Sequence, residues 1–173
     1  DNDTIRRGKP SAHIKFGEAS AVLAGNSLLT LAFEIITDVN YSLSASLKNE
    51  ITKSLAFCSG HTGIAGGQEL DLKFENKKKN LKQIINMQKK KTGKLFSFCL
   101  FAAAVVAKRS IKEKKSLSIL GEEIGLLFQF ADDFLDVKGS KKLVGKSIKK
   151  DNKKGKSTLV HLMGYENAYK YAN

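Results

Sequence analysis

Three carboxylates lie close together in the run FQFADDFLD, which spans Phe128 to Asp136 of an otherwise strongly basic chain. On a helix, Asp132 and Asp136 lie one above the other and Asp133 lies beside them. Gln129 lies on the side of Asp132, three residues earlier. Like charges at this spacing destabilise a helix by about 0.2–0.5 kcal/mol per pair, and a divalent cation relieves the repulsion. Carboxylate oxygens suit magnesium, which usually completes its coordination with water and phosphate oxygens. The pattern predicts a magnesium site, with a solvated acidic patch as the equal alternative for a DDxxD motif alone.

A segment rich in lysine and glycine follows these carboxylates. Its lysines are Lys146, Lys149, Lys150, Lys153, Lys154 and Lys156, and Gly145 and Gly155 each precede one of them. Such a loop beside a metal-binding helix is the arrangement expected for holding a diphosphate from both sides. A P-loop is excluded, because it requires a glycine five positions before the Gly-Lys pair, where this chain has Ser140 and Lys150.

Two further clusters have side chains suited to polar ligands. Arg6 and Arg7 precede a glycine and could each bind a separate anion in a bidentate manner, with a solvated basic terminus as the alternative. Gln68 and Asp71 lie one helical turn apart after paired glycines, which is weak evidence alone. The histidines, serines and cysteines form no defensible nucleophile arrangement in the sequence.

The chain has 173 residues and a formal net charge of +13, which comes almost entirely from lysine. This charge reflects either genome composition or an anionic partner, which would be nucleic acid or a phosphate-bearing metabolite. The lysine runs lack interleaved aromatic residues, so we expect no nucleic-acid partner. We interpret Cys58 and Cys99 as core residues in a reducing compartment. The apolar run Leu95–Ala107 is shorter than the ~20 residues that span a bilayer, so we expect a cytoplasmic protein without stable membrane insertion.

Apolar residues recur at helical spacing almost throughout, which predicts an all-α fold in a single domain. The predicted helices run from Pro10 through Ile36, from Leu47 to Phe74, from Leu81 to Val106, from Ser116 to Val137, and from Ser157 to the end. Connections are predicted at residues 38–42, 75–80 and 111–115. The third helix should kink at residues 91–93, which would expose backbone carbonyls there.

Glycines interrupt several of the predicted helices. Gly17 and Gly25 are eight residues apart and should share a face on which another helix can approach closely. The second helix contains Gly60, Gly63, Gly66 and Gly67. Each costs a helix up to about 1 kcal/mol, so these glycines need a packing or ligand reason.

The order of the motifs is more specific than any one of them. They are DNDTIRRGKPSAHIKFGEASAVLAGNSLLTLAF, GIAGGQELDL, KKKTGKL, GLLFQFADDFLDV and VGKSIKKDNKKGKST. Together they resemble the trans-prenyltransferase family, in particular its bacterial farnesyl diphosphate synthases, over residues 1 to 165. The resemblance implies an isoprenoid-synthase helical bundle around a central cavity, with residues 1–173 as one domain truncated at both ends. Such a fragment is expected to be inactive alone.

The resemblance also implies roles for individual residues. By similarity, Arg6 binds an allylic diphosphate and Arg7 binds isopentenyl diphosphate, while Asp71 lies in the cavity wall. The implied substrate-binding residues are Arg6, Arg7, Gln68, Lys91, Gln129, Lys146 and Lys156; the implied catalytic residues are Lys91, Thr92, Gln129 and Lys146; the implied ligands of Mg²⁺ are Asp1, Asp132, Asp133, Asp136 and Asp151.

The implied reaction condenses dimethylallyl or geranyl diphosphate with isopentenyl diphosphate, by ionisation, condensation and elimination, to give farnesyl diphosphate in a homodimer. Kink carbonyls and Gln129 would stabilise an allylic cation, and no protein base is required. One alternative is a synthase of geranylgeranyl or longer diphosphates. Others are a noncatalytic homologue, and a nucleic-acid-binding module recognised by salt-dependent binding.

Overall fold

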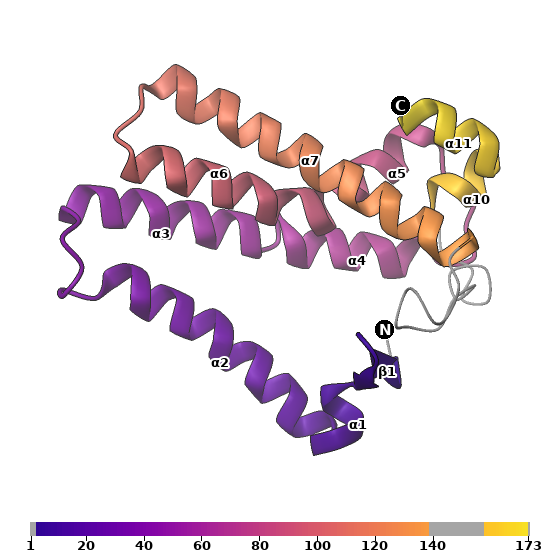
Figure 1. Cartoon of the computed structure of the whole chain (residues 1–173), viewed down its shortest axis with the longest axis horizontal. Coiled ribbons are helices and arrows are strands. Elements are labelled where there is room, and N and C mark those ends of the chain that lie inside the picture. Colours follow the sequence, from indigo (N-terminus) through magenta and orange to yellow (C-terminus); the bar gives the residue numbers. More distant parts are fainter. Residues whose placement is uncertain (1–2, 139–157, 173) are drawn as a thin grey trace.

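The structure, a computed structural model, describes residues 3–138 and 158–172, and these residues are mainly helical, as predicted (Figure 1). In chain order the elements are β1 (Ile5–Arg6), β2 (Lys9–Pro10), α1 (Ala12–Phe16), α2 (Glu18–Thr37), α3 (Ala45–Ser59), α4 (Ile64–Phe74), α5 (Leu81–Gln88), the π-helical turn η1 (Lys89–Gly93), α6 (Lys94–Val106), α7 (Ile111–Lys138), α10 (Leu159–Met163) and α11 (Tyr165–Ala172). Four predicted site residues, Asp1, Lys146, Asp151 and Lys156, lie outside the described residues.

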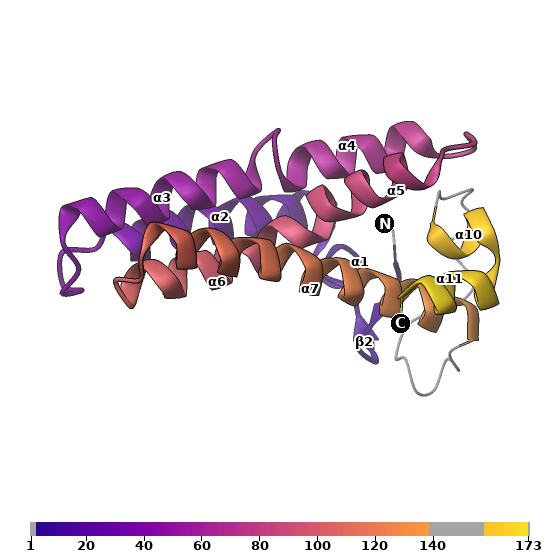
Figure 2. The same ribbon diagram turned by 90° about the horizontal axis from the view of Figure 1, so that it is seen from above.

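The helices form an elongated bundle in which α3 and α4 run end to end, alongside the continuous α5, η1 and α6 segment (Figures 1 and 2). Helix α7 packs antiparallel to α6, and α10 and α11 cover the C-terminal end of α7. A core cluster at that end contains Leu126, Phe130, Leu159 and Ala168. The bundle therefore holds η1 between α4 on one side and α7 on the other.

Glycines break three of the predicted helices. Gly17, with φ of 85°, separates α1 from α2, and Gly164, with φ of 78°, separates α10 from α11. The predicted helix from Leu47 to Phe74 is likewise two helices, because residues 60–63 leave the helical path between α3 and α4. The predictions of continuous helices were wrong here. At Gly17 and Gly164 the reason is that glycine adopts positive φ without the steric cost that other residues meet. At the break between α3 and α4, Gly60 and Gly63 have negative φ, with ψ values of −161° and −125° that lie outside the helical range.

The glycines inside or beside the helices differ in how closely other parts of the chain approach them. A Cβ on Gly63 would lie 1.9 Å from the Cys58 carbonyl oxygen, and a Cβ on Gly67 would lie 2.2 Å from the Lys91 backbone nitrogen. These contacts confirm the predicted packing reason. Gly25 differs, because nothing in the described part of the chain lies within 4 Å of an added Cβ. Gly17 lies between α1 and α2, so the two glycines do not share one helix, and no helix in the described part of the chain approaches Gly25 closely.

Helix α7 begins at Ile111, five residues before the predicted start, so the predicted connection at 111–115 was wrong. Ser110 and Glu113 form a capping box: the Glu113 carboxylate accepts from the Ser110 backbone N–H at 2.9 Å, and Ser110 Oγ accepts from the Glu113 N–H at 3.3 Å. This reciprocal pair satisfies backbone donors that a helix start leaves unpaired. Hydrogen bonds from Ser110 also hold the pKa of Glu113 below its usual value.

Helix α2 is long and apolar enough to cross a membrane by length and composition, with a mean hydropathy of 1.6 over 18 residues. Core helices of soluble proteins meet the same criterion, so this is weak evidence for insertion. The sequence analysis considered Leu95–Ala107 and missed α2. It was also wrong on Cys99, which is exposed, whereas Cys58 is buried and burial raises the pKa of its thiol.

Candidate functional site

The kink predicted at residues 91–93 is the π-helical turn η1, which begins at Lys89. The backbone N–H of Lys94 donates to the Lys89 carbonyl, five residues earlier, as a π-helical turn requires. Glycine backbones enclose the turn from both sides. A Cβ on Gly67 of α4 would strike the turn, and a Cβ on Gly125 of α7 would lie 2.6 Å from the Gly93 Cα. The close approach fixes the turn between two helices.

Lys91 is the turn residue that forms an ion pair with a buried carboxylate. Its Nζ lies 2.6 Å from Oδ2 of Asp71 on α4, and the side chains are 22% and 6% exposed. Asp71 comes one helical turn after Gln68, which is partly buried on the same helix. The ion pair thus places an ammonium group at the surface of the turn, where an anionic ligand could reach it.

A hydrogen-bonded chain extends from the turn to α7. Thr92 Oγ1 donates to Gln129 Oε1 at 2.8 Å, and Gln129 Nε2 donates to Asp133 Oδ1 at 2.9 Å. Asp133 Oδ2 accepts from Gln88 Nε2 of α5, also at 2.9 Å. Two residues predicted as catalytic from the sequence, Thr92 and Gln129, are therefore in direct contact.

The carboxylates of the acidic motif occupy different environments. Asp133 and Asp136 are buried, at 3% and 6% exposure, whereas Asp132 is partly exposed. Gln129, which the helical spacing placed on the side of Asp132, donates a hydrogen bond to Asp133, four residues further along α7. Within the described residues, no group of three acidic, histidine or cysteine side chains is placed to hold a metal ion. The three aspartates thus form no ready-made metal cage by themselves.

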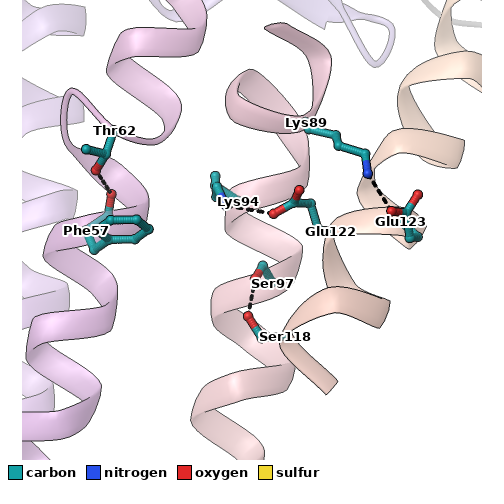
Figure 3. A network of polar contacts seen from close by, with 8 residues as sticks. All are labelled: Phe57, Thr62, Lys89, Lys94, Ser97, Ser118, Glu122 and Glu123. Carbon is teal, nitrogen blue, oxygen red and sulfur yellow. Dashed lines mark hydrogen bonds and ion pairs between the residues drawn. The ribbon is translucent and has the colours of Figure 1, made fainter. Parts of the chain in front are cut away.

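Two ion pairs flank the turn on its α7 side (Figure 3). Lys89 Nζ lies 2.5 Å from Glu123, and Lys94 Nζ lies 2.7 Å from Glu122. One helical turn further along α6, Ser97 and Ser118 share a partly buried hydrogen bond of 2.7 Å. Because the two lysines stand at the first residues of η1 and α6, these contacts fasten both ends of the turn to the same helix.

The two arginines predicted at a helix end lie instead in a hairpin. Arg6 pairs with Lys9 between β1 and β2, and Arg7 occupies the turn with φ of 52°. Both side chains are exposed, and the hairpin stands at the same end of the molecule as the C-terminal end of α7 (Figures 1 and 2). Adjacent arginines in a tight turn point in different directions, so each can meet its own anion.

The sequence analysis did not identify Gln88, Glu122 or Glu123. Glu122 and Glu123 had no sequence signal, because their partners on η1 and α6 are about 30 residues away. Gln88 is the last residue of α5, directly before the Lys-Lys-Lys-Thr-Gly run, and its polar side chain is buried. Its position in an otherwise apolar buried set, with Ile84 and Met87, was the signal that could have revealed it.

Comparisons with known proteins extend over nearly the whole chain. The family model described as polyprenyl synthetase matches residues 1–173. The chain is 38% identical to farnesyl diphosphate synthase of Bacillus subtilis, over 97% of this chain and 57% of that protein. It is 36% identical to geranylgeranyl diphosphate synthase of Cyanophora paradoxa, over 99% and 58%.

A solved structure matches the fold closely. Geranyltransferase from Helicobacter pylori, crystallised with magnesium and isoprenyl diphosphate, superposes with a TM-score of 0.90 at 36% identity. The match covers 99% of this chain and 56% of that one. The chain thus spans somewhat more than half the length of the proteins it resembles.

Proposed function

Because this chain belongs to the polyprenyl synthetase family, we propose that the complete protein containing it is a magnesium-dependent prenyltransferase. Its substrates are an allylic diphosphate and isopentenyl diphosphate, and its product is farnesyl diphosphate. The observation that carries the proposal is the turn η1, which presents Lys91 beside the Thr92 and Gln129 pair. A cationic group next to a polar but uncharged pair suits a substrate that separates into an anion and a cation.

Lys91 has the task of binding the diphosphate. The Asp71 carboxylate 2.6 Å away holds the ammonium in place, so little reorganisation is needed when the substrate enters. Negative charge grows on the diphosphate as its bond to the allylic carbon breaks. A prepositioned ammonium stabilises this charge more in the transition state than in the ground state, which is the condition for catalysis.

Gln129 and Thr92 have the task of facing the allylic cation. The carboxamide oxygen of Gln129 carries partial negative charge, and Thr92 holds it at 2.8 Å through its hydroxyl proton. Neither side chain is a good nucleophile at neutral pH, so the cation is stabilised without being captured. The double bond of isopentenyl diphosphate then attacks the cation, and a proton leaves the new carbon skeleton. We assign that proton to the released diphosphate.

The described residues fit magnesium in a limited way. Asp132 offers a partly exposed carboxylate, and magnesium in phosphate sites uses one or two carboxylates together with substrate oxygens and water. A metal bound there would neutralise charge on the diphosphate as a Lewis acid. Asp132 is our first choice of ligand in the described segment, while Asp1, Asp133, Asp136 and Asp151 remain sequence-based proposals. The diphosphate contacts of Arg6, Arg7, Gln68, Lys146 and Lys156 have the same standing.

A longer product is the second candidate. Its support is the geranylgeranyl diphosphate synthase of Cyanophora paradoxa, which matches this chain at 36% identity, close to the value for the farnesyl enzymes. We also propose that the complete protein is a cytoplasmic homodimer. The exposed apolar residues of α2, among them Leu23 and Leu28 at 64% and 67%, support a covered face in the assembly.

The test is to incubate the complete protein with geranyl diphosphate, labelled isopentenyl diphosphate and magnesium, and to separate the products by chain length. Farnesyl diphosphate as the main product supports the proposal, and accumulation of longer chains replaces it with the second candidate. Absence of any condensation, with the protein folded and magnesium saturating, would contradict both and indicate a noncatalytic homologue.

A further inference from the structure

Gln88 and Asp133 form a polar pair inside the bundle, where polar side chains require a reason. Each is 3% exposed, and they join α5 to α7 through a single hydrogen bond of 2.9 Å. Burying a carboxylate is costly unless hydrogen bonds compensate its lost hydration. An apolar pair of similar size would pack these helices without that cost, so packing alone does not account for the residues.

The pair acts on the orientation of Gln129. A carboxylate only accepts hydrogen bonds, so Asp133 Oδ1 requires the NH₂ end of the Gln129 carboxamide at 2.9 Å. The carboxamide oxygen is thereby turned toward η1, where it accepts from Thr92. A flipped carboxamide would set its oxygen against the Asp133 oxygen and its NH₂ group against the Thr92 hydroxyl. Asp133 therefore selects one of two orientations.

The hydrogen bond to Asp133 fixes the orientation of the Gln88 carboxamide and leaves its oxygen buried without a donor from the described part of the chain. Its NH₂ end donates to Asp133, and its Oε1, which is buried, has no hydrogen-bond partner among the described residues. An unpaired buried acceptor is normally avoided in native proteins. The donor to Asp133 is thus retained although the other end of the same side chain is unsatisfied. This is the pattern expected where the hydrogen bond serves a neighbouring group.

We propose that Asp133 and Gln88 are positioning residues, which orient the Gln129 carboxamide oxygen and, through it, the Thr92 hydroxyl toward the reacting allylic group. The proposal rests on the prenyltransferase function proposed above. It gives Asp133 a task that differs from the one assigned to Asp132, although the two are adjacent in the sequence. Gln88 is the better probe, because it belongs to α5 and lies outside the acidic motif.

The test compares Gln88→Met with wild type in the complete protein, because methionine keeps the volume and removes the donor. We expect kcat to fall about tenfold, as a misplaced reacting group does, with the magnesium dependence and the KM for isopentenyl diphosphate unchanged. Gln88→His, whose Nε2–H has a similar reach, should restore most of kcat. In a Gln129→Ala background, Gln88→Met should have little further effect, because its target is gone.

Ser97→Ala is the matched control. It removes another interhelical hydrogen bond, the partly buried 2.7 Å contact between α6 and α7, and should leave kcat unchanged. The positioning role is overturned if Gln88→Met leaves kcat at the wild-type value, or if its effect is equally large when Gln129 is alanine.

A second readout does not depend on catalysis. With ¹⁵N-labelled glutamine, the side-chain NH₂ group of Gln129 should be protected from hydrogen exchange in wild type and in Ser97→Ala, and should lose protection in Gln88→Met. Equal protection in all three proteins would contradict the proposal. If wild type shows the protection but condenses no substrates, the proposed function fails while the orienting contact stands.

Discussion

Helix α2 and the turn η1 differ in how closely the rest of the chain packs against them. None of the 20 residues of α2 is buried by the described part of the chain, although the helix is rich in leucine, valine and isoleucine. Around η1, by contrast, backbones approach so closely that an added Cβ on Gly67 or Gly125 would overlap a neighbour. The difference separates a region whose geometry is fixed within this chain from one whose apolar surface is left for a partner.

This comparison explains why the candidate site is held together within a chain that spans little more than half the length of the related proteins. The residues that hold Lys91, Thr92 and Gln129 come from α4, α5, α7 and the turn η1 itself. Each is anchored by an ion pair, a hydrogen bond or a backbone contact inside the same bundle. The surface of α2 carries no such anchor, so its arrangement in the complete protein depends on what covers it.

The largest effect should come from the acidic motif. In the complete protein, Asp132→Ala should lower turnover about 100-fold or more, because it removes a proposed metal ligand from the site. Since Asp132 is only partly buried, the midpoint of thermal unfolding should change little. Turnover of geranyl diphosphate at saturating magnesium is the measurement, and activity near wild type would exclude the ligand role.

The two regions can be compared directly through their glycines. Gly67→Ala should destabilise the protein by about 1–3 kcal/mol and reduce turnover, because the new Cβ overlaps the backbone of η1. Gly25→Ala on α2 should instead stabilise it by about 0.5–1 kcal/mol, through improved helix propensity in open space. Urea unfolding gives both values. If the complete protein covers Gly25 closely, the second substitution will destabilise, which would locate a contact surface on α2.

A smaller effect is expected when the charge on the turn is removed. Lys91→Ala should lower turnover about tenfold and raise the KM for the allylic diphosphate, because a preorganised cation at the leaving group is lost. Lys78→Ala, at an exposed position in the loop that follows α4, should change neither value. Equal effects would mean that the overall positive charge attracts substrate and that no specific contact is made.

The smallest effect belongs to the start of α7. Ser110→Ala removes an N-cap and should cost about 1 kcal/mol of stability at neutral pH, with turnover unchanged. The lowered pKa of Glu113 means that its contribution is complete above the unfolded-state value and is lost as the pH falls through the folded-state value. Unfolding measured across acidic pH should therefore show a weaker decline in the variant. An unchanged decline would show that Ser110 does not set this pKa.

Local patterns predicted the elements better than their boundaries. The turn at residues 91–93 was visible because Thr-Gly interrupts an apolar run, and the loop at 75–80 because it is wholly polar. The break at Gly17 was missed, since a glycine that continues a helix and one that ends it look alike without neighbours. The start of α7 was recoverable from Ser110 and Glu113, whose spacing is that of a capping box.

Within the site, residue types were predictable and pairings were not. Thr92 and Gln129 were both named from the sequence, but their contact depends on how α7 packs against η1. The acidic motif suggested one set of ligands, whereas packing buries Asp133 beside Gln88 and leaves Asp132 partly exposed. Helical spacing gives the direction of a side chain, and only the neighbouring helix decides whether that direction is interior or surface.

The π-helical turn also sets the phase of everything that follows it. Five residues close a ring that four close in an α-helix, so α6 is rotated by about 100° relative to an uninterrupted continuation of α5. The buried residues Ser97, Ala104 and Val105 face the core only with that rotation in place. Deleting one residue between Lys89 and Gly93 would restore ordinary helical winding and would also move every residue of α6 one position earlier, so the two rotations cancel and the same stripe of α6 stays inward. The turn thus accommodates one residue more than an α-helix of the same phase, and this confines the irregularity to the residues that carry the candidate site.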